Sequence, residues 1–288
     1  MNDKKAAASV ILAGVLWGII NIFVKKLSAA GLGSLQIAFS RMAVASVGFT
    51  GFLALTAPGK LRIKPRDIWM FIGTGIVSIV FFNCAYFYTM THGQASIAVV
   101  LLYTSPVFIM LLSRIIFKEK ITALKLFALV LTLAGCVLVA GLIGGQASIT
   151  PLIMLTGIAS GLFYALYTIF GRFALARYDS FTVTAFTFIF GLIGSIPFAD
   201  FNGFASALTA EPLLPLYILG LGIFSTILPY IFYTWGLQRM ESGKAAILVA
   251  VEPLVGAVIG MTLFHEPHDP MKLAGIACIL AAIVILNR

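Results

Sequence analysis

Ten apolar stretches, separated by short polar segments, follow one another along the chain. A helix needs about 20 predominantly apolar residues to cross the hydrocarbon core of a bilayer, whereas the strands of a β-barrel show alternating segments of about ten. The stretches match the helical length, and segments such as APGKLRIKPRD after the second and DFNGFASALTAEP after the seventh have the composition of loops. The pattern therefore predicts ten membrane-spanning helices, at residues 6–27, 34–57, 68–90, 95–117, 122–142, 151–173, 181–199, 213–237, 243–264 and 270–287.

The composition places the chain among all-α integral membrane proteins. Of its 288 residues, 61% are hydrophobic and only 10% are charged, and the mean hydropathy is +1.08. A soluble domain carries roughly 25% charged residues. The net charge of +9 comes mainly from Lys and Arg in short loops, and no basic stretch is interleaved with aromatic residues. No nucleic-acid partner is therefore expected.

The basic residues also predict an orientation in the membrane. With the N-terminus in the cytoplasm, most Lys and Arg fall on the inside, and the outer loops hold only Lys25, Lys26 and Lys272. Cytoplasmic loops of multi-pass proteins carry such an excess. We therefore expect a multi-pass protein of the cytoplasmic (inner) membrane with both termini in the cytoplasm. No loop is long enough to fold as a domain, so the function is expected inside the bundle.

Two segments, one in each half of the chain, are alike. SPVFIMLLSRIIFKE at 105–119 aligns with EPLVGAVIGMTLFHE at 252–266, and the alignment pairs Pro106 with Pro253 at an offset of 147 residues. The same offset, held without gaps, matches glycines, tyrosines and a lysine across most of the chain. One constant offset over this length predicts an internal repeat.

The repeat predicts one transport domain built from two five-helix halves, 1–147 and 148–288. Because five is odd, the second half is inverted relative to the first. Inverted repeats are typical of secondary transporters, whose halves move about a site near the membrane midplane. Pro106 and Pro253 are predicted hinges, because each proline removes a backbone donor and frees the carbonyl four residues earlier, that of Leu102 in the first half and that of Val249 in the second.

At this point the chain resembles the drug/metabolite transporter superfamily, and within it the EamA-type ten-helix transporters. The residues that carry the resemblance are LWG at Leu16–Gly18, SRMAVA at Ser40–Ala45, and two P-x10-F-x-E segments that end at Glu119 and Glu266. The resemblance covers essentially the whole chain. It implies a bundle of ten helices and secondary transport, and the substrates of relatives include amino acids, other metabolites, drugs and nucleotide precursors.

Arg41 and Glu252 are the two ionisable residues that lie deep within predicted spans. A charge at this depth costs on the order of 3 kcal/mol or more, so each should face the protein interior or a wet cavity. Three interpretations of Glu252 remain open: a structural strut paired with Arg41, a ligand for a cationic part of the substrate, or a proton carrier, because removal from water favours the protonated carboxyl group. The resemblance implies that both residues recur in the family, which favours a structural or gating role as much as substrate contact.

Polar and aromatic residues recur on one face of several predicted spans. In the first span Gly14, Trp17, Asn21 and Lys25 follow helical spacing. Tyr164 stands where the repeat would place a second tryptophan, so the two halves of the site are expected to differ. Helix packing is the alternative for the glycines, and an interfacial aromatic belt is the alternative for tyrosines near span ends. The predicted cavity residues are Trp17, Asn21, Arg41, Asn83, Tyr86, Tyr103, Ser105, Tyr164, Thr168, Tyr230, Tyr233 and Glu252.

Two charged pairs are predicted to act as gates. Lys25 and Glu266 lie on the outer face, and Glu119 and Arg172 lie on the inner face, so each half supplies one member of each pair. Such pairs would form and break as access alternates. The nearby HEPHD segment lacks the spacing of a helical HExxH motif, and no metal site is expected there.

These features predict a secondary transporter that moves small metabolites, such as amino acids or related amphiphilic compounds, out of the cell by alternating access. No Walker motif is present, so no ATPase partner is expected, and proton exchange remains open. We expect no cofactor and no enzymatic activity, since one buried glutamate does not make a catalytic site. The alternatives are an exporter of drugs or organic cations with the same fold, a channel, or an intramembrane enzyme.

Overall fold

The computed structural model describes residues 2–93, 95–141, 150–265 and 269–286, and within these ranges every regular element is helical. Eight helical stretches are long and apolar enough to cross a membrane. Two further apolar helices, α8 (Ala123–Val139) and α16 (Pro270–Leu286), have 17 residues each. The all-helical fold is confirmed. The described residues give eight full-length spans and two shorter apolar helices, so the count of ten membrane-spanning helices stays a prediction.

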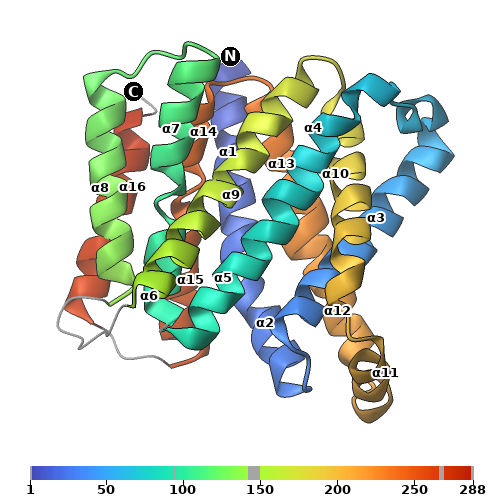
Figure 1. The fold of residues 1–288 in the computed structure, drawn as a ribbon. Helices are drawn as coiled ribbons and strands as arrows, with labels where there is room; N and C mark the ends of the chain where they lie inside the picture. The colour runs from blue at the N-terminus through green and yellow to red at the C-terminus, as the bar shows by residue number, and fades with distance from the viewer. Residues whose placement is uncertain (1, 94, 142–149, 266–268, 287–288) are drawn as a thin grey trace.

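Figure 1 shows the course of the chain. In the first half, α8 is preceded by α1 (Asn2–Gly18), α2 (Ile20–Ala29), α3 (Ser34–Thr56), α4 (Ile68–Ile72), α5 (Phe81–His92), α6 (Ala95–Leu102) and α7 (Ser105–Ile116). In the second half, α16 is preceded by α9 (Pro151–Leu175), α10 (Ser180–Ser195), α11 (Phe201–Ala210), α12 (Leu214–Gly222), α13 (Leu228–Leu237), α14 (Ser242–Leu248) and α15 (Val251–Leu263). Short 3₁₀ turns lie at Pro58–Leu61, Pro65–Asp67 and Ile196–Phe198.

The fourth and ninth predicted spans are each broken into two helices. The break between α6 and α7 lies just before Pro106, and the break between α14 and α15 lies just before Pro253. The prediction of a freed carbonyl at Val249 is wrong, because this oxygen accepts a hydrogen bond from the backbone N–H of Glu252 at 3.1 Å. A tight turn of the backbone across the break therefore replaces the helical bond that the proline cannot make.

Two π-helical segments interrupt the third and eighth spans, and no feature of the sequence pattern predicted them. They are η3 (Gly73–Val80), between α4 and α5, and η5 (Ile223–Ile227), between α12 and α13. Their last residues, Val80 and Ile227, are separated by the same 147 positions that separate Pro106 from Pro253. Segments of π-helix are rare and change the register of a helix face locally.

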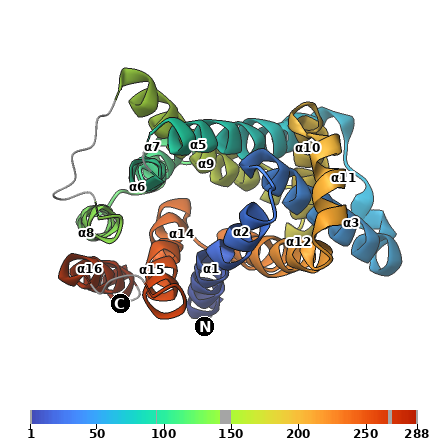
Figure 2. The same ribbon diagram turned by 90° about the horizontal axis from the view of Figure 1, so that it is seen from below.

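The helices form a bundle with two distinct ends. In Figure 1, α1 begins and α16 ends at the same end, which we call the termini end. The links from α2 to α3 and from α5 to α6 lie at the opposite end. Figure 2 views this opposite end, with α5, α6 and α9 on one side and α1, α2, α12 and α15 on the other. α8 and α16 pack side by side at the edge of the bundle.

The outer surface and one connecting segment complete the fold. Val47, Leu55 and Ile115 are 71%, 88% and 73% exposed, as expected for side chains that face lipid. The segment after the seventh span, expected to be a loop, forms the helix α11. It begins where Asp200 Oδ1 accepts a hydrogen bond from the N–H of Gly203 at 3.0 Å, which is the bonding of a helix N-cap.

Candidate functional site

A cavity of about 500 Å³ lies inside the bundle, between the two sides seen in Figure 2. Ser28 in α2, Ser34 at the start of α3 and Lys272 in the first turn of α16 belong to its lining. Because these residues lie at the ends of their helices, the cavity reaches the opposite end of the bundle. Its volume is in the range of sites that bind small molecules.

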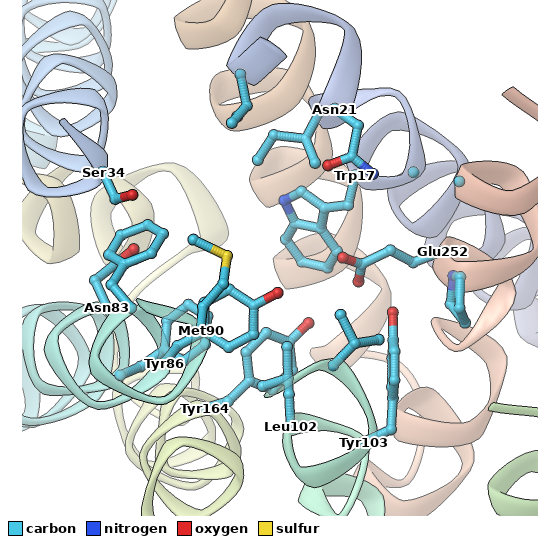
Figure 3. Close-up of a pocket in the computed structure, with 18 of the residues that line it drawn as sticks. Trp17, Asn21, Ser34, Asn83, Tyr86, Met90, Leu102, Tyr103, Tyr164 and Glu252 are labelled. Atoms are coloured by element: carbon cyan, nitrogen blue, oxygen red, sulfur yellow. The ribbon is translucent and has the colours of Figure 1, made fainter. Parts of the chain in front are cut away.

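The structure brings together most of the predicted cavity residues, on seven different helices and the break between α6 and α7. Figure 3 shows the arrangement, with side chains from both halves facing one space. Nine of the twelve line the cavity, namely Trp17, Asn21, Arg41, Asn83, Tyr86, Tyr103, Tyr164, Tyr230 and Glu252. Ser105, Thr168 and Tyr233 are not part of the lining. Ser105 is buried at the start of α7. The hydroxyl groups of Thr168 and Tyr233 are hydrogen-bonded to each other, with 2.7 Å between the oxygens, outside the cavity lining.

Packed aromatic rings close the inner part of the cavity toward the termini end. The Trp17 ring lies 5.1 Å from Tyr230 and 5.4 Å from Tyr233, measured between centroids. Tyr167, which the sequence pattern did not single out, packs edge-on against Tyr230, and its hydroxyl lies 2.8 Å from that of Thr234. This aromatic floor consists of Trp17, Tyr167, Tyr230 and Tyr233. Trp17, Tyr167 and Tyr233 are buried, and the contacts join rings from α1, α9 and α13 on this side of the cavity.

A second closure lies beyond the aromatic floor, where Glu119 meets Arg172. Their side chains form an ion pair with an N–O distance of 3.8 Å. Glu119 also accepts hydrogen bonds from the N–H groups of Ser242 and Gly243 at the start of α14, at 2.9 and 3.2 Å. Arg172 donates to the carbonyl of Leu237 at 3.0 Å and to that of Met240. The pair therefore holds both ends of the link between α13 and α14.

Replacing Arg172 by alanine is expected to open the termini end. Hydrogen bonds from a charged group contribute about 1.5–3 kcal/mol each. Their loss should therefore shift the equilibrium between the closed and the open termini end by about tenfold or more toward the open form. The reporter is a cysteine at Ser113, which is fully buried in α7, in a protein whose three native cysteines are serine. Its reaction with a small thiol reagent should become about tenfold faster.

The matched control for this change is Arg239→Ala. Arg239 lies in the link after α13 and is exposed, and its guanidinium donates a hydrogen bond to the carbonyl of Trp235 in α13 at 2.9 Å. This variant removes an arginine near the same link without removing the closure. Equal labelling rates in Arg172→Ala and Arg239→Ala would show that the Glu119–Arg172 pair does not hold the termini end closed.

The predicted outer gate lies partly outside the described residues. Glu266 falls in the undescribed segment 266–268, so the pairing of Lys25 with Glu266 stays a prediction. The ammonium group of Lys25 lies 3.4 Å from the centroid of the Phe264 ring, close to the end of α15. Lys25 therefore reaches the C-terminal end of α15.

Arg41 and Glu252 both line the cavity but do not pair with each other. Within the described ranges, no ion pair joins their side chains. The Nε of Arg41 donates a hydrogen bond to the hydroxyl of Thr226 in η5 at 3.1 Å. The carboxylate of Glu252, near the start of α15, points into the cavity on the side where the hydroxyl groups of Tyr103 and Tyr164 lie (Figure 3). The interpretation of Glu252 as a strut for Arg41 does not describe this conformation.

Comparison with known proteins identifies the family. The EamA-like transporter family matches residues 4–141 and again residues 151–288. This chain belongs to the EamA-like transporter family. It is 28% identical to an uncharacterized transporter of Archaeoglobus fulgidus over 98% of this chain and 96% of that protein. It is 23% identical, over 100% of this chain and 95% of the relative, to a protein of Streptantibioticus cattleyicolor named as a probable terminal-alkyne amino-acid exporter.

The fold also has a counterpart among solved structures. One crystal structure superposes with a TM-score of 0.77 and covers 98% of this chain and 96% of its own, at 18% sequence identity. The likeness shows that the two proteins share a fold. The resemblance that the motifs indicated, to EamA-type members of the drug/metabolite transporter superfamily, is thus confirmed by the family match over nearly the whole chain.

This EamA-like transporter also has a cluster of charged residues that the sequence pattern did not single out. Asp67 is 1% exposed, contacts Arg177, and accepts a hydrogen bond from the hydroxyl of Tyr178 at 2.7 Å. Beside it, Lys60 pairs with Asp179 at 3.3 Å. Burial raises the pKa of Asp179, but its hydrogen bonds and its ion pair prevail, so this pKa lies below its usual value. The cluster ties the loop before α4 to the loop before α10.

Proposed function

We propose that this EamA-like transporter is a secondary carrier that exports small amphiphilic metabolites, such as amino acids, across the cytoplasmic membrane. The observation that carries the proposal is a cavity of about 500 Å³ that reaches one end of the bundle and is closed toward the other by an aromatic floor and an ion pair. A carrier needs such a conformation, in which the site faces only one side. The amino-acid exporter among the relatives supports this class of substrate.

The proposed mechanism is alternating access between two inverted halves, 1–147 and 148–288. Three features support the repeat: the two matches to one family, the breaks before Pro106 and Pro253, and the π-helical segments at equivalent positions. The halves would rock about the cavity, with the two prolines as hinges. With the termini in the cytoplasm, the conformation described here would face outward, and the Glu119–Arg172 pair would be the closed inner gate.

A second candidate is the export of organic cations or drugs by the same mechanism. It is favoured by a specific observation, since Glu252 presents a carboxylate to a cavity whose walls carry Trp17 and several tyrosines. Aromatic faces and a carboxylate together attract cationic ligands. A substrate panel that includes quaternary ammonium compounds separates the two candidates.

Proton coupling through Glu252 has a direct test in proteoliposomes. In an exchanger that exports substrate and takes up protons, labelled amino acid should enter faster when the lumen is more acidic than the bath. The Glu252→Gln variant cannot exchange its proton, so whatever flux it keeps should not respond to the gradient. The measurement is initial uptake with and without the pH gradient. If the gradient changes neither protein, Glu252 does not carry the coupled proton.

A further inference from the structure

The cavity contains one basic and one acidic side chain that form no ion pair within the described residues. Arg41 and Glu252 line the same cavity, and no ion pair joins them or ties either to another described side chain. Each such charge costs about 2.5–3.5 kcal/mol or more at the depth of a membrane span. A pair would reduce this cost, so its absence leaves both groups available to a ligand. The remaining charge in the lining, Lys272, lies near the mouth.

The guanidinium of Arg41 is held in a defined orientation by Thr226. The Thr226 hydroxyl donates to the carbonyl of Leu221, five residues earlier, at 3.1 Å. Its oxygen then accepts from the Nε of Arg41, also at 3.1 Å. The first of these bonds follows the five-residue spacing of the π-helical segment η5. With Nε committed, the two terminal nitrogens of Arg41 make no hydrogen bond within the described ranges, and they form the fork that binds a carboxylate in two places.

Glu252 is the acidic group of the cavity and complements Arg41. Its carboxylate points into the cavity, and the hydroxyl groups of Tyr103 and Tyr164 lie on the same side, as Figure 3 shows. A carboxylate with tyrosine hydroxyls beside it accepts hydrogen bonds from an ammonium group. A ligand that is only a cation would leave Arg41 unpaired, and a ligand that is only an anion would leave Glu252 unpaired.

We infer that the cavity recognises the head group of a zwitterion, with Arg41 binding the carboxylate, Glu252 binding the ammonium group, and Thr226 acting as the positioning residue for Arg41. This inference rests on the proposed function and names the chemistry by which the carrier would select amino acids. It gives the two ionisable residues of the cavity different roles, because each binds a different group of the ligand. Trp17 and Tyr230 then remain for the side chain of the ligand.

The test measures binding in detergent to the full-length protein, by the rise in its thermal unfolding midpoint with ligand concentration. The standard L-amino acids are screened first. The tightest binder is then compared with its decarboxylated amine and its deaminated acid, which lack one charge each. The zwitterion should bind at least about tenfold more tightly than either analogue, the factor that about 1.4 kcal/mol gives.

Three variants assign the charges to residues. Thr226→Val removes the hydroxyl at nearly constant shape. It should weaken the binding of the zwitterion about tenfold and leave the binding of the amine unchanged. Thr226→Ser keeps the hydroxyl and should keep the preference for the zwitterion. Glu252→Gln should remove the preference for the zwitterion over the acid. Unchanged amine binding in Thr226→Val also shows that this variant is folded.

The outcomes that overturn the inference are distinct from those that overturn the proposed function. Equal binding of zwitterion and amine, an equal loss of both in Thr226→Val, or no binding by any of the amino acids would each refute zwitterion recognition. A protein that fails in this way and still carries an organic cation in proteoliposomes would keep the carrier function. A protein that binds the zwitterion and shows no saturable flux would keep the site and lose the carrier function.

Discussion

Replacing Gly14 by alanine is expected to lower the thermal unfolding midpoint and to reduce transport by about tenfold or more, the factor that about 1.4 kcal/mol in a barrier gives. A β-carbon at Gly14 would lie 2.5 Å from the Val251 side chain and 2.6 Å from the carbonyl oxygen of Val249. Both residues flank the break between α14 and α15, so the backbone of the predicted hinge would have to move. Overpacking of this kind costs typically about 1–3 kcal/mol, which exceeds the gain of up to about 1 kcal/mol from replacing a helical glycine.

The chain provides a matched control for this change. Gly51 also lies in a membrane helix, α3, and a β-carbon there would meet nothing within 4 Å. Gly51→Ala should therefore keep transport and raise the midpoint slightly. Gly161, the counterpart of Gly14 in the predicted repeat, lies against the other break, with a β-carbon 2.9 Å from the carbonyl of Leu101. Gly161→Ala should therefore behave like Gly14→Ala. If Gly14→Ala and Gly51→Ala transport equally well, the close approach at the break has no role.

Replacing Trp17 by alanine is expected to have the second large effect. Trp17 is 7% exposed and contacts both Tyr230 and Tyr233, so its removal leaves a hole in the aromatic floor. A buried tryptophan truncated to alanine costs about 3–5 kcal/mol. The thermal midpoint should fall, and transport should decrease because the floor no longer closes the cavity. Both are measured on the purified protein, in detergent and in proteoliposomes.

Trp69→Ala serves as the comparison for that change. Trp69 is 45% exposed and packs against Phe170 and Phe173 at the surface of the bundle. Its truncation should cost less and leave transport close to that of the wild type. Trp17→Phe should retain most activity, since an aromatic ring still fills the floor. Equal losses in the two alanine variants would contradict a special role of the floor.

Much of the fold was accessible from the sequence because it depends on local pattern. Apolar length gave the positions of most spans, and the prolines located the breaks before Pro106 and Pro253. The helix α8 ends three residues earlier than expected, and beyond its end Gly141 adopts a left-handed backbone conformation with φ of 68°, which ends helices. The π-helical segments η3 and η5 carry no sequence signal, because their register depends on how the neighbouring helices pack.

Most of the residues predicted for the cavity do line it, but the contacts between their side chains could not be predicted from the sequence. Helical spacing and depth placed nine of the twelve predicted residues on one cavity. Depth alone could not say whether Arg41 and Glu252 meet, because the direction of a side chain depends on tertiary packing. Thr226 is 185 positions from Arg41 and lies in a segment without regular α-helical register, so nothing local indicated their hydrogen bond. The position of Tyr167, three residues after Tyr164, was the available signal for its place in the floor.

The central claim, that this EamA-like transporter is a carrier with alternating access, is tested most directly by counterflow in proteoliposomes. Vesicles are preloaded with an unlabelled amino acid that the protein binds, and uptake of the same labelled compound is followed from outside. A carrier predicts transient accumulation of label above equilibrium and saturation of the rate with concentration. Uptake that rises linearly with concentration and is indifferent to the unlabelled amino acid inside would contradict the claim and indicate a channel.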